Sequence, residues 1–506
     1  MIKTSHLWGG LPAVLLALAA LPVGAQSFRV QCPTRGTSLH PLQNPAMDQS
    51  DTNLITTPGA IKCQEIGGGD GFATMGDGHQ IYLFGFAPLS GLGDPNPLAR
   101  VPGILTGDPG TETPDVFNST DTAESRRARV EPADIMNNGV LYSNAPAPLI
   151  AIDEDDELFL TLSNVGQIMR PDLFEQHTVH FHGYPNASSF FDGVPDASVA
   201  INIAGSFTYY YTAPDAGTYF WHCHIAPPEH LQMGMVGQLF VRPRQNRLTA
   251  SDNLYNSLKS ANIANALKVN GATDGSCSDI LCTGATPLPA TASAATGGAK
   301  YAYNDGDGST QYDVEVPIQI MGFDPNFHFV GMTFNPEAFA DMKDKYFLLN
   351  GRSYPDTINA NVDNRGRPGT VGTVPNGPLA TQGSDGASRP SQPLHALITL
   401  DKTNGPKRAL LRISDLSVTE HTTLATLGIP MQVIGQNARL LRDTAGNNLY
   451  YQTNSVTLGG GESTDVILDS AGVPDGTYFL YSTNLDHLSN DAENFGGQMT
   501  EIVVKN

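Results

Sequence analysis

The sequence predicts an all-β protein built from two copies of one β-sandwich. Of its 506 residues, 52 are glycine and 36 are proline, whereas only 15% are charged. This composition favours short strands joined by many turns over helical bundles. A duplicated motif, GTYFWHCH at 217–224 and GTYFLYST at 476–483, stands near the end of each of two strand-rich stretches. We interpret the motif as a structural repeat, and 40% hydrophobic residues are enough for two cores.

The first strand-rich stretch follows a segment, 26 to about 70, that is predicted to be irregular. Apolar and polar residues then alternate as in half-buried strands. The predicted strand regions are HQIYLFGF (79–86), three strands within 139–164, HTVHFHG (177–183), SFTYYYTA (206–213), GTYFWHCHI (217–225) and GQLFVRP (237–243). A long polar insertion, about 88–132, interrupts them, and its role is open.

The second strand-rich stretch is predicted to be a separate domain. Its strands are expected in DVEVPIQIMGF (313–323), KYFLLNG (345–351), LHALITL (394–400), ALLRISDL (409–416), GIPMQVIG (428–435), STDVILD (463–469), GTYFLYST (476–483) and MTEIVV (499–504). The predicted organisation is a first domain with its extension at 26–245, a linker at 246–310 with a short helix near 253–267, and a second domain at 311–506. The alternative for 246–310 is a long surface loop within one domain.

The N-terminus has the pattern of an export signal. Lys3 precedes an apolar run at 11–21, and small residues at 23–25 would allow cleavage before Gln26. Residues 1–25 are therefore predicted to be a signal peptide, and the protein is predicted to be periplasmic or secreted. No later stretch has the roughly 20 apolar residues of a membrane helix.

The net charge of −22 argues against nucleic acid as a partner, because the phosphates would be repelled. It favours cationic substrates, although the same acidity would simply keep an exported protein soluble. Of the five cysteines, Cys277 with Cys282 and Cys32 with Cys63 could form disulfides in an exported protein. Cys223 is then the odd one, and an odd cysteine needs another explanation.

That explanation lies in six histidines, the cysteine and a Met-Gly-Met between positions 177 and 235. On a strand, alternate residues share a face. His180 and His182 should therefore point together, as should His222 and His224, with Cys223 opposite to its two neighbours. One cysteine, two histidines and a weak methionine form the ligand set of blue copper. Zinc does not need the methionine, and buried structural histidines do not cluster in this way.

The segments HTVHFHGYPNASSFFDGVP (177–195) and GTYFWHCHIAPPEHLQMGM (217–235) resemble the copper motifs of multicopper oxidases, the laccase-like members of the cupredoxin superfamily. The resemblance implies cupredoxin-like Greek-key domains and several coppers, type 1 together with type 2, type 3 or both. Its type 1 ligands are His177, Cys223, His230 and, axially, Met235; Met233 is the second sulfur available. Its half of a trinuclear oxygen-reducing cluster is His180, His182, His222 and His224.

The same resemblance gives Asp192 the place of an acid that relays protons to bound oxygen; a turn-forming Asp-Gly is the alternative. The second domain resembles a cupredoxin domain that has lost its type 1 copper, with 482–484 where HCH would stand. Its histidines are His328, His395, His421 and His487, and none of them forms an HxH pair. A complete eight-histidine cluster is therefore not visible in the sequence.

A blue copper in the first of two domains also resembles two-domain laccases and copper nitrite reductases, which are homotrimers. By that resemblance His487 would complete a type 2 site with His182 and His222 of a neighbouring subunit. The leading hypothesis is an oxidase that takes electrons from a phenol or a metal ion at type 1 copper and reduces dioxygen at a second copper site. The alternatives are a nitrite reductase and a non-catalytic electron-transfer or copper-holding protein.

Overall fold

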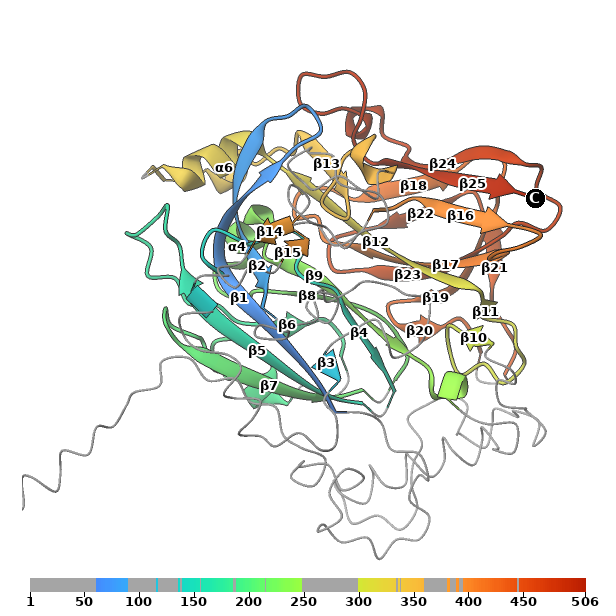
Figure 1. Ribbon diagram of the computed structural model, residues 1–506, viewed down its shortest axis with the longest axis horizontal. Helices are drawn as coiled ribbons and strands as arrows, with labels where there is room; N and C mark the ends of the chain where they lie inside the picture. The colour runs from blue at the N-terminus through green and yellow to red at the C-terminus, as the bar shows by residue number, and fades with distance from the viewer. Residues whose placement is uncertain are drawn as a thin grey trace, which may run out of the picture.

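The computed structural model describes residues 61–89, 115–116, 135–136, 139–247, 299–358, 380–382, 388–390 and 395–506, except positions 155, 185–187, 214, 334, 337 and 444–445. The predicted signal peptide, the short helix near 253–267 and both predicted disulfides involve positions outside this description. Among the described residues, no helix is long and apolar enough to cross a membrane. Strands dominate, as Figure 1 shows, and the prediction of an all-β protein is confirmed.

The first β-unit, residues 61–247, is a sandwich of two sheets (Figure 1). One sheet has the order β2-β1-β5-β7, with β3 beside β1, and the other has the order β4-β9-β8-β6. The strands are β1 (Ile61–Thr74), β2 (Gln80–Pro88), β3 (Asp115–Val116), β4 (Ile150–Asp153), β5 (Glu157–Gly166), β6 (His180–Phe181), β7 (Ser206–Thr212), β8 (Gly217–His222) and β9 (Val236–Arg242). A short helix, α4 (Pro227–Met233), joins β8 to β9.

The second β-unit, residues 299–506, is a second sandwich. Its larger sheets have the orders β13-β12-β17-β23-β19-β20, with β21 beside β19, and β16-β25-β24-β18-β22. Two small sheets pair β10 with β11 and β14 with β15. The strands are β10 (Lys300–Tyr301), β11 (Gln311–Tyr312), β12 (Val314–Phe323), β13 (Tyr346–Leu349), β14 (Ala380–Gln382), β15 (Ser388–Pro390), β16 (Ile398–Asp401), β17 (Arg408–Asp415), β18 (Thr422–Thr426), β19 (Met431–Gln436), β20 (Arg439–Leu440), β21 (Tyr451–Thr453), β22 (Ser455–Leu458), β23 (Ser463–Asp469), β24 (Gly476–Ser482) and β25 (Met499–Lys505). Helix α6 (Pro325–Met332) follows β12.

The two units share one topology, which confirms the predicted repeat. In each unit the first strand pairs in parallel with a later one, β1 with β5 and β12 with β17. In each unit the other sheet also begins with a parallel pair, β4 with β9 and β16 with β25. The two GTYF strands, β8 and β24, occupy the same place between β9 and β6 and between β25 and β18.

The irregular extension predicted up to about residue 70 is wrong for residues 61–70. These residues belong to β1, which lies between β2 and β5. The glycines of IGGGDG suggested a loop, but here they permit close packing. A Cβ at Gly69 would lie 2.8 Å from the Gly166 carbonyl oxygen, and one at Gly71 would lie 2.5 Å from the Ser143 carbonyl oxygen. Strand-interior glycines often mark such close backbone approaches.

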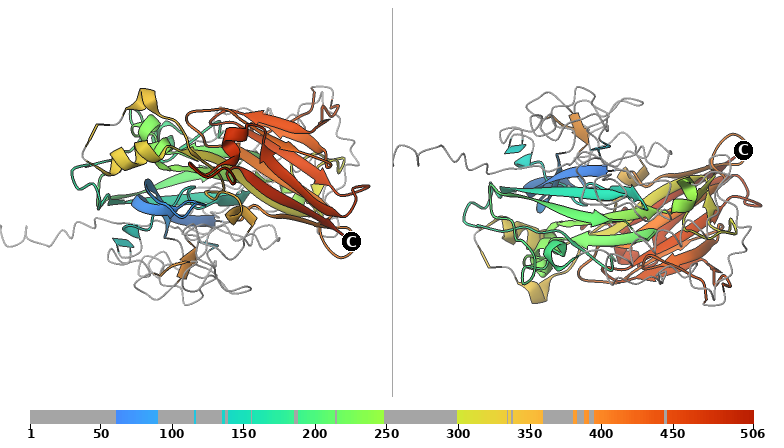
Figure 2. Two further views of the ribbon diagram at one scale, coloured as in Figure 1. Left: turned by 90° about the horizontal axis from the view of Figure 1, so that it is seen from above. Right: turned by 90° about the horizontal axis from the view of Figure 1, so that it is seen from below.

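The two β-units pack side by side, as both views in Figure 2 show. One apolar cluster draws on both of them, and its members include Leu83, Phe220, Val236, Met321, Phe323 and Leu348. Two partners from the second unit also bind Gln232 of α4. The side-chain amide of Gln232 donates to Asp344 at 2.7 Å. The backbone carbonyl oxygen of Gln232 lies 2.9 Å from Nε2 of His328. The second unit therefore supports the helix that joins β8 to β9.

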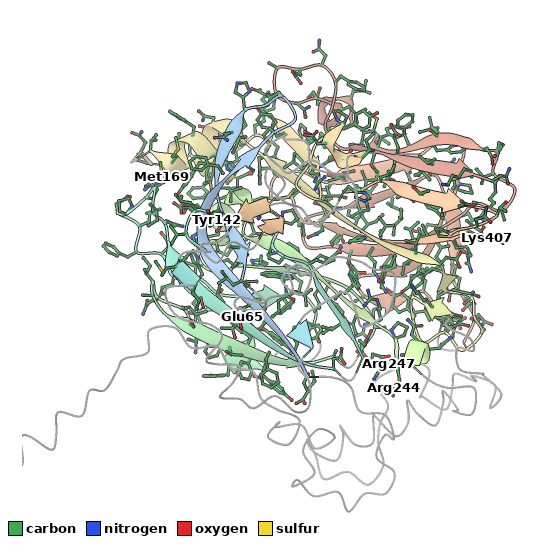
Figure 3. The ribbon with its side chains drawn as sticks, in the orientation of Figure 1. Glu65, Tyr142, Met169, Arg244, Arg247 and Lys407 are labelled. Carbon is green, nitrogen blue, oxygen red and sulfur yellow. The ribbon has the colours of Figure 1, made fainter. Side chains whose placement is uncertain are left out.

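The first unit ends in a hydrogen-bonded corner at the lower right of the coloured ribbon in Figure 3, where Arg244 and Arg247 are labelled. The Arg244 amide donates to the Glu154 carboxylate, and the Arg247 guanidinium donates to the Glu154 carbonyl oxygen. Between them, the Gln245 side chain donates to Asp305 of the second unit at 2.9 Å. Both described ends of the predicted linker are therefore packed against the two sandwiches.

A buried charge cluster also crosses this interface. Glu315 on β12 accepts hydrogen bonds from Arg242 of β9 at 2.8 Å and from Arg412 of β17 at 2.7 Å. Asp465 lies 3.5 Å from Arg412 and accepts a 2.6 Å bond from Thr218 of β8. Burial alone would raise the pKa of Glu315, but the two guanidinium groups hold that pKa below its usual value.

We expect Glu315→Gln to lower the free energy of unfolding by about 3–5 kcal/mol, because it leaves buried guanidinium charge uncompensated. The pKa of Glu315 is lower in the folded protein than in the unfolded chain. Its contribution to the free energy of unfolding is therefore fully present above the unfolded-state pKa of Glu315 and is lost as the pH falls through the folded-state pKa. Chemical denaturation of both proteins measures the difference. Asp469→Asn is the control, because its ion pair with Arg408 is partly exposed and should contribute less than about 1 kcal/mol. Equal losses in the two variants would contradict the prediction.

Candidate metal centre

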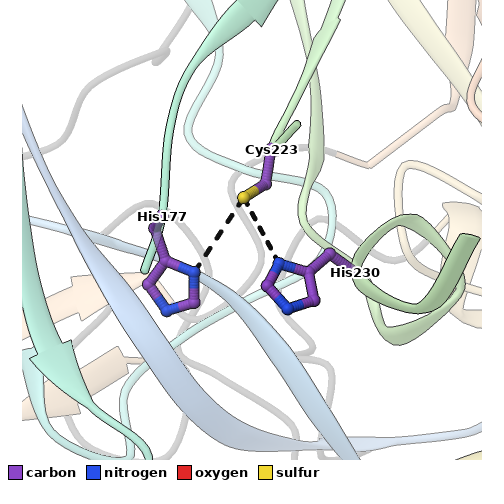
Figure 4. A group of neighbouring side chains, drawn as sticks. All are labelled: His177, Cys223 and His230. Atoms are coloured by element: carbon purple, nitrogen blue, oxygen red, sulfur yellow. Dashed lines mark hydrogen bonds between the residues drawn. The ribbon is translucent and has the colours of Figure 1, made fainter. Parts of the chain in front are cut away.

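Three side chains converge where β8 ends, as Figure 4 shows. Cys223 directly follows β8, and His230 lies in α4. His177 is held by two backbone hydrogen bonds with Ile201, at 3.1 and 3.0 Å. The three ligand atoms lie within 4.8 Å of one another, and all three residues are buried. His177 and His230, which lie 46 and 7 positions from Cys223 in the sequence, thus meet at its sulfur.

Both imidazoles turn the same nitrogen toward the cysteine. Nδ1 of His230 lies 3.3 Å from Sγ of Cys223, and Nδ1 of His177 lies 3.9 Å from it. Met235 is fully buried in the same apolar cluster, as is Met233. The backbone places Met235 beside the group, because its N–H donates to the His230 carbonyl oxygen at 2.8 Å and its own carbonyl oxygen accepts from the Cys223 N–H at 3.0 Å.

The chemistry of this donor set fits a copper ion. Burial by itself would raise the pKa of the Cys223 thiol, but the charge of His230 and hydrogen bonds from both histidines hold it well below its ordinary value. The thiolate is the form of cysteine that binds metals. A buried thiolate with two imidazole nitrogens and a thioether nearby is a soft set that selects copper over oxygen-preferring ions.

Gly68 on β1 makes room for His177. A Cβ at position 68 would lie 2.8 Å from Cδ2 of His177 and 3.3 Å from Cδ1 of Leu162. A side chain at this position would therefore force the His177 imidazole or the neighbouring strand to shift. Sequence reasoning missed this residue, since the contact joins positions 109 residues apart and the surrounding glycines resemble a turn.

Glu175 is a second residue that sequence reasoning missed. Its carboxylate lies 3.5 Å from Nε2 of His230. The His230 side chain is fully buried, whereas that of Glu175 is 24% exposed. A hydrogen bond with His230 holds the pKa of Glu175 below its usual value. Glu175 thus places a negative charge between solvent and the buried histidine, and its position two residues before His177 was the available signal.

A second group of histidines lies on the other side of Cys223. Nε2 of His182 and Nε2 of His222 face each other at 2.9 Å, and these two residues with His180 form a group that could hold a metal ion. His224 joins them, because its ring lies 5.0 Å from that of His180 and 5.5 Å from that of His222. The predicted alternation holds: Cys223 points to one side, and the histidines before and after it point to the other.

Two members of this histidine group have imidazoles with lowered pKa values. Burial lowers the pKa of His222 to about 3 and that of His182 to about 4. Both rings are therefore neutral near pH 7, and a neutral imidazole offers the lone pair that metals require. The His222 Nδ1 lies 2.6 Å from the Cys223 carbonyl oxygen. That bond fixes the proton on Nδ1 and leaves Nε2 to face His182.

Asp192 lies beside the same group. Its carboxylate is 3.4 Å from Nδ1 of His180, and its backbone carbonyl oxygen is 2.7 Å from the same nitrogen. The side chain is 30% exposed, so solvent reaches it. It also precedes Gly193, whose φ of +81° marks a turn. Asp192 thus lies both beside the histidine group and at the start of a turn, and its role as a proton-relaying acid stays a prediction.

A pocket of about 360 Å³ opens next to His182. Its lining combines both β-units: His182, Phe220, Pro227, Pro228 and Leu231 from the first, and 417–421 with Gly460 from the second. A Cβ at Gly461 would lie 2.8 Å from Nδ1 of His182, and one at Gly459 would lie 3.0 Å from Nε2 of His421. A single glycine turn thus packs against a histidine from each unit.

The other predicted ligand, His487, lies elsewhere and is buried. Its Nδ1 is 3.1 Å from Oγ of Ser482, and its Nε2 is 2.9 Å from the Glu420 carboxylate. Its ring stacks on Phe347 with centroids 4.1 Å apart. Both ring nitrogens therefore have partners within the chain, and His487 would have to give one of them up to bind a copper ion. Its role as an intersubunit ligand stays a prediction.

Comparison with known proteins adds an independent line of evidence. Residues 125–246 match the family model of multicopper oxidases. A multicopper oxidase of Mycobacterium tuberculosis is 31% identical over 107 residues, which are 21% of this chain and 20% of that protein. A laccase of Aspergillus fumigatus is 33% identical over 104 residues, or 20% of this chain and 16% of that protein. The chain thus matches a fifth or less of the length of these relatives.

Among solved structures, a blue copper oxidase from Nitrosomonas europaea is similar at 17% identity and a TM-score of 0.49, over 87% of this chain and 85% of that one. The family model covers every residue of the two histidine groups and ends one position before Arg247. The donor set of the site and the match to the family model therefore fall on the same segment of the chain. Residues 125–246 of this chain therefore match a multicopper oxidase domain.

Proposed function

We propose that this protein is a copper-dependent oxidase that takes single electrons from a reducing substrate and delivers them to dioxygen. The observation that carries the proposal is the shared position of the two metal-binding groups: Cys223 belongs to one, and its neighbours His222 and His224 belong to the other. A type 1 copper would be held by His177, Cys223, His230 and Met235. One or more further coppers would be held by His180, His182, His222 and His224. The bound copper ions supply the redox chemistry.

The chain's own residues would connect the site where the reductant is oxidised with the site where dioxygen is reduced. Glu175 would accept a cationic reductant, such as a reduced metal ion, beside His230, and the covalent backbone from Cys223 to its neighbours provides a short path for electrons. The pocket beside His182 offers space for a small molecule. Asp192 would relay protons towards the histidine group beside His180. With the export signal predicted at 1–25, the site of action would be periplasmic or extracellular.

Two alternatives make different demands on the structure. A nitrite reductase of a trimeric type needs His487 from another subunit, whereas both ring nitrogens of His487 have partners here. A pure electron carrier does not need four histidines behind its cysteine. The oxidase is therefore the better proposal, and a homotrimer is not required by it.

We expect the purified protein to hold type 1 copper and at least one further copper, and to consume oxygen. Cys223→Ser should abolish the blue absorption but leave the EPR signal of the further copper, because its histidines remain. The double variant His182→Ala, His222→Ala should keep the blue absorption and lose that EPR signal and oxygen consumption. Copper analysis, optical spectra, EPR and oxygen consumption are measured for the wild type and for both variants. A single copper with only a blue signal in the wild type would rule out the oxidase.

We expect Glu175→Gln to lower kcat/KM for a cationic reductant, ferrous or cuprous ion, by about tenfold. That corresponds to about 1.4 kcal/mol, a magnitude expected for one charge near a partly exposed partner. A neutral phenol should be affected less than about twofold, since it gains no charge attraction. Asp172→Asn is the matched control, because Asp172 is a nearby acid that pairs with Arg170. A parallel fall for both substrates would contradict a role in cation binding.

We expect Gly68→Ala to weaken or shift the blue absorption, because the added Cβ would lie 2.8 Å from the His177 ring. Contacts under about 3 Å force one partner to move, and the imidazole is the partner that shifts away from Cys223. Gly476→Ala is the control, since the nearest atom to its Cβ would be 3.9 Å away. An unchanged spectrum in a folded Gly68→Ala protein would show that His177 is not constrained in this way.

A further inference from the structure

A buried carboxyl group of the second unit reaches the pocket beside His182 through one hydroxyl group. Thr419 stands between β17 and β18 and lines this pocket. Its hydroxyl donates to Oδ2 of Asp344 at 2.6 Å. Asp344 is 3% exposed, and a Cβ at Gly322 would overlap its Oδ2, so the glycine keeps the space that the carboxyl group occupies. One side chain thus separates this buried carboxyl group from the pocket.

The surroundings of Asp344 favour its protonated form. Burial raises the pKa of Asp344 to about 6, and the negative charges of Glu420 and Asp324 act in the same direction. The hydrogen bonds from Thr419 and Gln232 act against this rise. An acid whose pKa lies near the working pH is suited to give up a proton and to take it back. Asp344 is thus a carboxyl group that changes its charge close to neutral pH.

The two oxygens of Asp344 have different partners. Oδ1 accepts from the side-chain amide of Gln232 at 2.7 Å, and Oδ2 accepts from Thr419. Both bonds stabilise the ionised carboxylate. When Oδ2 carries a proton, the carboxyl group donates to the Thr419 oxygen instead, and the Thr419 hydroxyl proton turns toward another acceptor. Because Thr419 lines the pocket, a molecule bound there is the acceptor that this change serves.

The pocket needs a proton donor if dioxygen is reduced beside His182. Reduction of dioxygen to water takes up one proton for each electron. Asp192 contacts His180 and lies outside the lining of this pocket. Besides His182, the first unit lines the pocket with apolar side chains that supply no protons: Phe220, Pro227, Pro228 and Leu231. A donor for this space therefore has to come from the wall that the second unit forms.

We infer that Asp344 supplies protons through the Thr419 hydroxyl to oxygen that is reduced in the pocket beside His182. In each transfer the proton on Oδ2 of Asp344 passes to the Thr419 oxygen, and the hydroxyl proton of Thr419 passes to the acceptor in the pocket. Thr419 is unchanged by the transfer, Asp344 becomes a carboxylate held by Gln232, and no electron moves. Water in the pocket reloads Asp344 by the reverse route. The inference rests on the proposed oxidase and assigns the second unit a part in its chemistry.

Asp415 and Ser417 form a second pair behind the same wall of the pocket. Ser417 also lines the pocket, and its N–H donates to Asp415 at 2.8 Å. Burial raises the pKa of Asp415 to about 7, and the Glu462 charge acts in the same direction. Oδ2 of Asp415 has no hydrogen-bond partner among the described residues. Loss of the route through Asp344 should therefore reduce the supply of protons without ending it.

Thr419 is the position that tests the route, because Thr419→Val removes the hydroxyl and leaves Gln232 untouched. We expect Thr419→Val to lower kcat for oxygen consumption of the copper-loaded protein by about tenfold, less than the roughly hundredfold effect of losing a sole general acid. The blue absorption and KM for the reductant should stay unchanged. Thr419→Ser restores a hydroxyl and should return kcat to within about twofold of the wild type. Thr423→Val is the matched control, because the Thr423 hydroxyl bonds Thr457 at an exposed site, and it should leave kcat unchanged.

The pH dependence of kcat identifies the acid. In the wild type, kcat should fall as the pH rises through about 6, because Asp344 then loses the proton that it donates. This fall should be smaller in Asp344→Asn. An unchanged kcat in Thr419→Val would overturn the inference, and so would equal losses in Thr419→Val and Thr419→Ser, since they would indicate a purely structural role.

A measurement on the copper-free protein separates this inference from the proposed function. The infrared band of protonated carboxyl groups should contain a component that titrates near pH 6 in the wild type and is missing in Asp344→Asn. In Thr419→Val this component should titrate at a higher pH, because the hydroxyl no longer stabilises the carboxylate. A component that does not move in Thr419→Val would contradict the inference. Failure of the proposed function would instead appear as a copper-loaded wild-type protein that consumes no oxygen.

Discussion

The position of Cys223, one residue beyond the end of β8, is the constraint on which the functional part of this molecule depends. Residues on either side of it alternate between the two faces of the sheet. The pairing of β8 with β6 therefore gathers His180, His182 and His222 on one side, while the turn into α4 brings His230 to the sulfur on the other. Two groups of candidate metal ligands are therefore positioned by one strand end.

Much of this arrangement could be predicted from the sequence, since it depends on local alternation. The GTYF repeat, the facing of His222 and His224 and most strands of the second unit follow from periodicity. What could not be predicted depends on long-range contacts. Glycines in β1 resemble a loop until the neighbouring strands are present. Glu175 gains its meaning only when α4 brings His230 to it, and the fixing of His487 by Glu420 depends on the pairing of β18 with β24.

The second unit contributes to the site without offering paired histidines of its own. Asp344 and His328 hold Gln232, which lies between His230 and Met235 in the segment that borders the candidate copper site. This support acts on both the side chain and the backbone of one residue, and burial shields it from competing water. The second unit thus helps to fix the geometry of the candidate site in the first.

The apolar cluster shared by Phe220, Val236, Met321 and Phe323 has a consequence for the integrity of the chain. Each sandwich lacks part of its own packing unless the other covers it, and the Glu315 cluster adds charges that only the joined form neutralises. Separating the two sandwiches would therefore expose apolar surface and leave buried charge without its partner. Noncovalent contacts thus hold the two halves together in addition to the backbone that connects them.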